Sequence, residues 1–258
     1  MKALPILVMA QLAAIFPLFL WLVPVRVIKG GFFRFNLGMA TTLLGISTML
    51  GMVNGIDGPA GWWVLALATV SLAILGMTWH RPAMARNLLL PPLLGWGLLL
   101  WQVSLAGQLP AIHWEHWVAM SLGGFGLASV MFAMVLGHWY LNVTELPIQY
   151  LGRGISLAFG ALTVHLVWVM AILSTKTIIL NYRAKPAYRL LMTTDGFFLW
   201  IGLILGLIAP LVIDWLAWRT ARLGATQSAT GLLYVSLILV VMGLLIFDSF
   251  ILQMGLPV

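Results

Sequence analysis

Five side chains between positions 138 and 214 are suited to proton transfer and hydrogen bonding: His138, Tyr140, Glu145, Arg153 and Asp214. Imidazole and carboxylate groups exchange protons near neutral pH, and phenol and guanidinium groups donate hydrogen bonds. A quinone needs this combination, because its two oxygens accept hydrogen bonds and its reduced form releases protons. The set therefore predicts a quinone site, with His138 as hydrogen-bond partner and proton acceptor and with Asp214 or Glu145 as relay.

A histidine pair suggests haem b as a second cofactor, since histidine is a common axial ligand of haem iron. Only His138 and His165 lie inside apolar segments. Counted from the predicted helix ends at about 1.5 Å per residue, their depths differ by roughly 13 Å, which makes them a poor pair for one iron. Ligation by one histidine and one methionine remains open, because the chain has 14 methionines.

A third combination, His113 with Glu115 and His116, has two histidines on one helical face. It lacks the HExxH pattern of zinc enzymes and stands at the start of an apolar segment, so no metal site is predicted there. The chain has no cysteine, which excludes disulfides, thiolate metal sites and a cysteine nucleophile.

The composition determines what kind of protein carries these groups. Hydrophobic residues make up 62% of the chain and charged residues only 7%, whereas a soluble domain has roughly 25% charged residues. A soluble enzyme and a disordered chain are both excluded. The net charge of +7 does not indicate nucleic-acid binding, because the basic residues lie in short gaps between apolar runs, where they contact lipid headgroups.

A membrane-spanning helix needs about 20 mainly apolar residues. We therefore expect an all-α, polytopic membrane bundle in which residues 1–258 form a single integral membrane domain without a soluble domain. The predicted spans are 3–24, 36–54, 61–79, 88–106, 117–140, 153–174, 196–218 and 228–254.

The basic residues of the short loops indicate the orientation, because cytoplasmic loops are enriched in lysine and arginine. The odd-numbered loops hold Arg26, Lys29, Arg34, Arg81, Arg86, Arg153, Arg219 and Arg222. These loops are expected in the cytoplasm, so both chain ends are expected outside, in an inner (cytoplasmic) cell membrane.

The predicted boundaries also bring the five candidate site residues to one layer near the cytoplasmic face. Span 117–140 leaves the membrane just after His138, and span 153–174 begins at Arg153. Ordinary roles compete with the site hypothesis, because aromatic residues such as Tyr140 anchor helix ends and Arg153 is a typical topology charge.

The sixth loop does not follow the charge rule. It carries Lys176, Arg183, Lys185 and Arg189, yet eight spans place it outside. Either one span is miscounted or re-entrant, or Arg183, Lys185 and Arg189 dock an acidic partner subunit. Asp248, late in the last span, is expected near the same face, either paired with Arg183 or Arg189 or solvated.

Small residues and prolines predict how the spans pack. Gly202 and Gly206 form a GxxxG pattern, and Gly123, Gly124 and Gly126 clear one face of the fifth span. Small residues let helix backbones approach closely, so these faces are expected to hold the bundle together. The prolines Pro17, Pro91, Pro92 and Pro210 are expected to kink their spans.

The eight-span build, the lack of a soluble domain and the segment Ser228-Ala229-Thr230-Gly231-Leu232-Leu233-Tyr234 give a resemblance to a known family. The chain resembles the quinone-interacting membrane anchor subunits of respiratory oxidoreductases, of the polysulfide-reductase and dimethyl-sulfoxide-reductase type. That resemblance implies catalysis in partner subunits, with this chain as anchor and quinone site. Two other functions remain open from the sequence: a secondary transporter or channel for a small solute, and a structural or assembly subunit without chemistry of its own.

Overall fold

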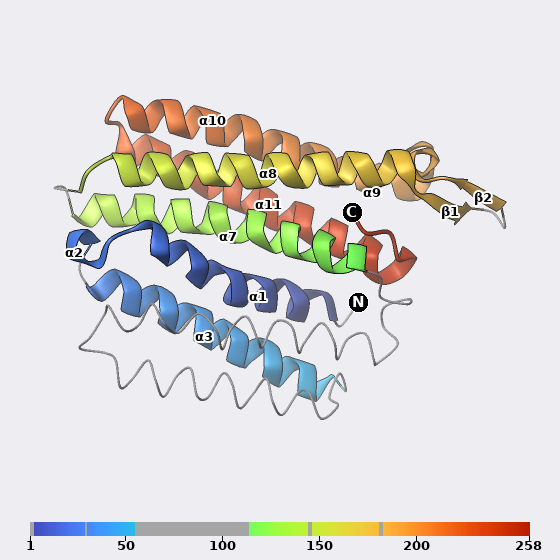
Figure 1. Ribbon diagram of the computed structural model, residues 1–258, viewed down its shortest axis with the longest axis horizontal. Coiled ribbons are helices and arrows are strands. Elements are labelled where there is room, and N and C mark those ends of the chain that lie inside the picture. The colour runs from blue at the N-terminus through green and yellow to red at the C-terminus, as the bar shows by residue number, and fades with distance from the viewer. Residues whose placement is uncertain (1–2, 29, 55–113, 144–145, 181–182) are drawn as a thin grey trace.

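The computed structural model describes residues 3–28, 30–54, 114–143, 146–180 and 183–258 (Figure 1). Nearly all of these residues are helical, as the sequence predicts. The elements are α1 (Ala3–Ile15), the 3₁₀ helix η1 (Phe16–Leu22), α2 (Val25–Ile28), α3 (Gly30–Val53), α7 (Trp114–Asn142), α8 (Gln149–Thr175), β1 (Thr177–Leu180), β2 (Arg183–Pro186), the 3₁₀ helix η3 (Ala187–Met192), α9 (Thr194–Leu203), the π-helical segment η4 (Ile204–Ile208), α10 (Ala209–Arg222) and α11 (Thr226–Met254).

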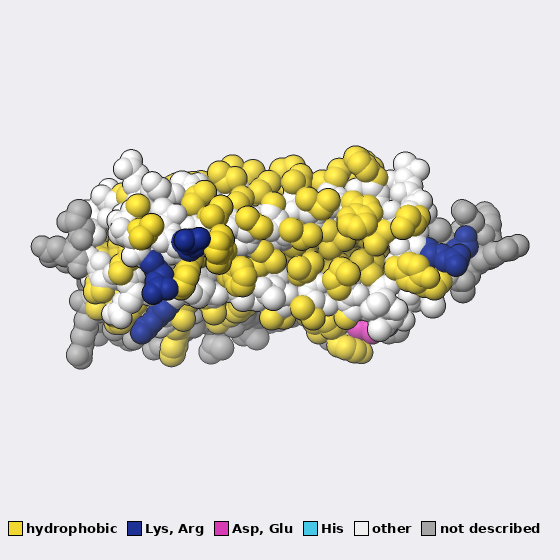
Figure 2. Space-filling model, turned by 90° about the horizontal axis from the view of Figure 1, so that it is seen from above, with side chains coloured by type: hydrophobic (Ala, Val, Ile, Leu, Met, Phe, Trp, Pro, Cys, Tyr) yellow, Lys and Arg dark blue, Asp and Glu magenta, His cyan; other side chains and the backbone are white. Residues whose placement is uncertain are grey.

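Five helical segments of the described chain are long and apolar enough to cross a membrane: Leu4–Leu22, Trp114–Asn142, Gln149–Thr175, Thr194–Arg222 and Thr226–Met254. The chain is therefore a multi-pass membrane protein. Hydrophobic side chains cover its middle, and lysine and arginine gather towards both ends (Figure 2). Helix α3 contains residues 36–53 of the predicted span 36–54, but it is not one of these five segments. The predicted spans 61–79 and 88–106 lie outside the described residues.

Four antiparallel helices form the centre of the bundle (Figure 1). Helix α7 packs against α8 and α11, and α10 packs against the same two helices, so the four close into a ring. Helix α1 packs on α7 and α11, and α3 packs on α1. Three elements meet at the ring of Phe132, whose centroid lies 6.5 Å from that of Phe16, 5.8 Å from Phe19 and 6.4 Å from Phe32.

Glycines set the closest helix contacts, as the sequence predicts. Gly206 lies against the backbone of Gly243 in α11, and a side-chain carbon at Gly202 would touch Ile246 and Phe247. On α7, Gly124 faces Gln11 of α1. In a bilayer, apolar side chains gain little free energy when they leave the lipid for a contact between helices. Close packing of the helix backbones therefore contributes most to their association.

Two of the four prolines expected to kink their spans coincide with a change of helix type, and Pro91 and Pro92 lie outside the described residues. Pro17 stands at the start of η1, where the first span tightens from α-helix to 3₁₀ helix. Pro210 follows the π-helical segment and cannot donate a backbone hydrogen bond to the preceding turn. The α9–α10 span, Thr194–Arg222, is one continuous helix that widens to a π-helical turn around Gly206.

The sixth loop contains the one described departure from an all-helical chain. Strands β1 and β2 pair antiparallel, with Thr177 opposite Pro186 and Leu180 opposite Arg183. This hairpin extends beyond the helices, at the end of the bundle where both chain ends lie (Figure 1). Lys176 anchors its base through a 2.6 Å ion pair with Glu115 at the start of α7.

The last residues of the chain fold back on the bundle. Gly255 ends α11 in the left-handed conformation (φ +64°), which glycine adopts without strain. The indole of Trp168 then donates a 2.9 Å hydrogen bond to the Pro257 carbonyl, and His116 bonds the Gly255 carbonyl at 2.9 Å. Leu256 and Val258 are buried by these contacts.

Candidate functional site

The predicted site residues that the structure describes lie in the half of the bundle opposite the hairpin. His138 lies in the last turns of α7, Arg153 in the first turns of α8, and Asp214 in the first half of α10, eight residues before Arg222. Glu145 lies outside the described residues. The side chains of His138, Arg153 and Asp214 point into different surroundings.

His138 faces α11, where its Nδ1 atom lies 3.4 Å from the hydroxyl oxygen of Tyr234. The contact depends on Gly137, because a side-chain carbon there would lie 2.6 Å from the Thr230 hydroxyl. Tyr234 follows Thr230 by one turn of α11. Close approach of α7 and α11 at Gly137 thus places an imidazole beside a phenol, and both side chains are exposed on the outer surface.

Tyr140 has a structural role. Its side chain is buried, and its hydroxyl donates a hydrogen bond to the carbonyl of Pro147. This bond ties the end of α7 to the connection that leads into α8. Tyr140 is therefore directed away from the contact between His138 and Tyr234.

Asp214 lies inside the four-helix ring and is 0% exposed. Its polar neighbour is Ser236 of α11, although neither carboxylate oxygen nor the serine hydroxyl forms a hydrogen bond of normal geometry with the described residues. Tyr234 and Ser236 are two residues apart, which is about 200° around a helix. Asp214 and His138 consequently lie on opposite sides of α11.

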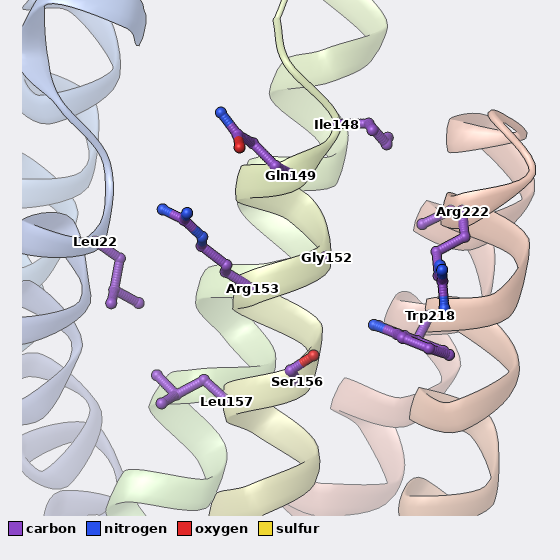
Figure 3. Close-up of a pocket in the computed structure, with 10 residues that line it drawn as sticks. Leu22, Ile148, Gln149, Gly152, Arg153, Ser156, Leu157, Trp218 and Arg222 are labelled. Carbon is purple, nitrogen blue, oxygen red and sulfur yellow. The ribbon is translucent and has the colours of Figure 1, made fainter.

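Arg153 lines a groove of about 660 Å³ on the outer face of the molecule. The groove extends over α8 from Leu22 on one side to Trp218 and Arg222 of α10 on the other (Figure 3). Arg153 and Gln149 point towards Leu22, and Ser156 lies on the side that faces Trp218 (Figure 3).

His165 is 3% exposed and packs edge-on against Phe247 at 5.3 Å between ring centroids. Its Nε2 atom has no hydrogen-bond partner among the described residues. It borders a cavity of about 10 Å³ together with Gly206 and Leu244, which is about the space that one water needs.

The two histidines proposed as haem ligands do not meet. The His165 ring lies level with Gly123 of α7. His138 is fifteen residues further along the same helix, about 22 Å at 1.5 Å per residue. One iron cannot bind both side chains, so this pair does not fit haem b.

Asp248 corrects an expectation. It is 1% exposed and therefore not solvated, and it accepts a 3.0 Å hydrogen bond from the side-chain amide of Gln11. It forms no ion pair with Arg189, the candidate partner whose side chain the structure describes. Helix α11 continues to Met254 and the end of the chain folds over it, so Asp248 lies deeper than its position in the sequence suggests. Oδ1 of Asp248 and Oε1 of Gln11 have no partner in the described part of the chain.

The buried ionisable groups occupy successive depths in the bundle. Asp214 lies beside Ser236, His165 beside Leu244, and Asp248 four residues further along α11. From Ser236 to Asp248 the rise is about 18 Å, more than half of the hydrocarbon thickness. Ionisable groups inside spans are costly and mark ion or proton pathways.

Sequence reasoning did not assign Tyr234 or Ser236 to a site, because tyrosine and serine are common in membrane helices.

Within the described ranges, no three histidine, aspartate or glutamate side chains are grouped so that they could hold a metal ion. Comparisons with protein-family models, with curated proteins and with solved structures give no significant match.

Proposed function

We propose that this chain is an integral membrane subunit of a respiratory-type electron-transfer complex in which His138 and Tyr234 bind a quinone headgroup. The observation that carries the proposal is the 3.4 Å approach of the imidazole and the phenol at one end of α7 and α11. The second ring nitrogen of His138 and the Tyr234 hydroxyl offer two hydrogen-bonding positions for the quinone.

The surroundings of the pair suit a substrate that arrives through the membrane. Tyr234 is 43% exposed. From Tyr234 towards the hairpin end, α7 and α11 present the apolar surface of membrane-spanning helices. Quinol oxidation releases two electrons and two protons. In this proposal His138 accepts one proton from a quinol oxygen, and the second proton passes to the water at this end of the bundle. Both electrons pass to a redox centre in a partner subunit that covers the same end.

The hairpin is the proposed contact to a partner subunit other than the one that accepts the electrons. Arg183, Lys185 and Arg189 belong to the hairpin and to η3, at the end of the bundle opposite His138. An isolated two-stranded hairpin is marginally stable in water. We propose that an acidic partner subunit covers it. Eight crossings, both chain ends outside and an inner-membrane location complete the proposal.

The test is quinone binding and quinol oxidation by the complex purified gently from its native membrane. The variants H138A and Y234F should lower the quinone content and the oxidation rate at least tenfold while the assembly stays intact. Y188F is the matched control, because Tyr188 is also exposed but lies at the hairpin end. A protein that purifies alone and without quinone would overturn the proposal.

A proton-coupled secondary transporter is the second candidate, favoured by a different observation. Asp214, His165 and Asp248 lie buried at successive depths, and the α9–α10 span contains a π-helical turn beside His165. π-helical turns are frequent at functional sites, and buried ionisable groups inside spans mark ion or proton pathways. This function predicts proton-coupled solute uptake by the chain alone in liposomes, and D248N should abolish it. Uptake without any partner would exclude the electron-transfer proposal.

A further inference from the structure

The groove across α8 changes in polarity with depth. Gln149, Arg153 and Arg222 line it near the ends of α8 and α10, and Leu157 lies further along α8 (Figure 3). Gly152 lies at the exposed centre, where an added side-chain carbon would meet nothing within 4 Å. A charged rim beside an apolar wall, at the end of membrane-spanning helices, matches a lipid whose headgroup lies above its acyl chains.

Among the described residues, the exposed charged side chains beside the groove are all basic. Arg153, Arg219 and Arg222 are exposed. Within the described ranges, the one ion pair joins Lys176 to Glu115, at the opposite end of the bundle. Asp214 is buried inside the ring and faces Ser236. The described surface around the groove therefore carries positive charge without a neighbouring carboxylate.

Aromatic rings hold these arginines in place. The guanidinium carbon of Arg222 lies 4.6 Å from the ring centre of Trp218, that of Arg219 lies 5.0 Å from Trp215, and that of Arg153 lies 5.7 Å from Tyr150. Stacking uses the face of the guanidinium group and leaves its N–H edge available. The edge donates to phosphate oxygens with good geometry.

We propose that this groove binds the phosphate-bearing headgroup of an anionic glycerophospholipid, with Arg153 and Arg222 as donors on either side of Gly152. Ser156 and Gln149 supply additional neutral hydrogen bonds. The site does not depend on the quinone proposal, because it is separate from His138 and Tyr234 and uses none of the buried carboxyl groups.

The experiment is lipid binding to the purified full-length chain in detergent, measured by native mass spectrometry with added dioleoylphosphatidylglycerol or dioleoylphosphatidylcholine. We expect preferential retention of phosphatidylglycerol. The double variant R153Q/R222Q should bind it about 25-fold more weakly, since a basic residue near a membrane surface contributes about fivefold in affinity. R189Q is the matched control, because Arg189 is exposed at the opposite end of the bundle.

A second variant separates lost charge from lost folding. G152L fills the open groove, keeps both arginines and improves helix propensity, so it should weaken phosphatidylglycerol binding without lowering the unfolding temperature. Equal retention of the two lipids, or unchanged binding by both variants, would overturn the proposal. Displacement of the lipid by millimolar inorganic phosphate, independent of acyl chains, would assign the groove to a soluble phosphate compound instead.

Discussion

The side-chain amide of Gln11 in α1 donates a 3.0 Å hydrogen bond to the carboxyl group of Asp248 in α11. This buried bond joins the first described span of the chain to the last, next to Gly124 of α7. Two polar groups that are individually costly inside a membrane thus satisfy part of each other's bonding capacity.

The first prediction concerns this pair. Q11L should lower the free energy of unfolding by about 1–3 kcal/mol, because it leaves the Asp248 carboxyl group buried without its hydrogen bond. Q253L is the control, since Gln253 is exposed on the same helix. The double variant Q11L/D248L should recover stability, because both polar groups are removed. Thermal unfolding in detergent measures all three, and an equal loss for Q11L and Q253L would contradict the prediction.

The second prediction concerns the contact that brings His138 to Tyr234. G137A should separate α7 from α11, because the new methyl group would lie 2.6 Å from the Thr230 hydroxyl. The result should be a loss of stability together with weaker quinone binding. G137A/T230A should restore both properties, since removal of the threonine side chain makes room for the methyl group. If the double variant is as impaired as G137A, the steric explanation fails.

The hydrophobic pattern was sufficient to place the described spans. The predicted segments 117–140, 153–174, 196–218 and 228–254 correspond to α7, α8, α9–α10 and α11 within a few residues at most boundaries. Length and hydropathy determine these elements locally, and the glycine contacts follow from residue size. The number of spans over the undescribed residues remains a prediction.

The arrangement of the site could not be obtained in the same way. Depth along a helix is readable from the sequence, which is why His138 and Asp214 were assigned to one layer. Which helix each side chain faces depends on packing, and α11 separates the two. Asp248 illustrates the same limit, because its hydrogen bond to Gln11 requires α1, which reaches it only in the tertiary structure.

The third prediction concerns the ion pair at the base of the hairpin. Lys176 and Glu115 are partly exposed, so K176Q should change the free energy of unfolding by about 1 kcal/mol or less. The local stability of the hairpin should fall more than the free energy of unfolding of the whole protein, because the ion pair fixes the base of the hairpin to α7. Hydrogen exchange of the β1–β2 amides should therefore accelerate in K176Q and remain unchanged in K185Q. Equal exchange in the two variants would show that the ion pair does not anchor the hairpin.

The fourth prediction concerns the closest helix contact in the described bundle. Gly206 and Gly243 touch through their backbones, and a side-chain carbon on either glycine would overlap the other residue. G206A should therefore push the α9–α10 span away from α11 and lower the unfolding temperature relative to the unmodified protein, although alanine is the better helix former. G160A is the matched control, because Gly160 of α8 has open space around it, and this variant should be neutral or slightly stabilising. Because backbone atoms cannot move aside as a flexible side chain can, no second substitution at Gly243 should rescue G206A, and rescue by one would contradict the backbone contact.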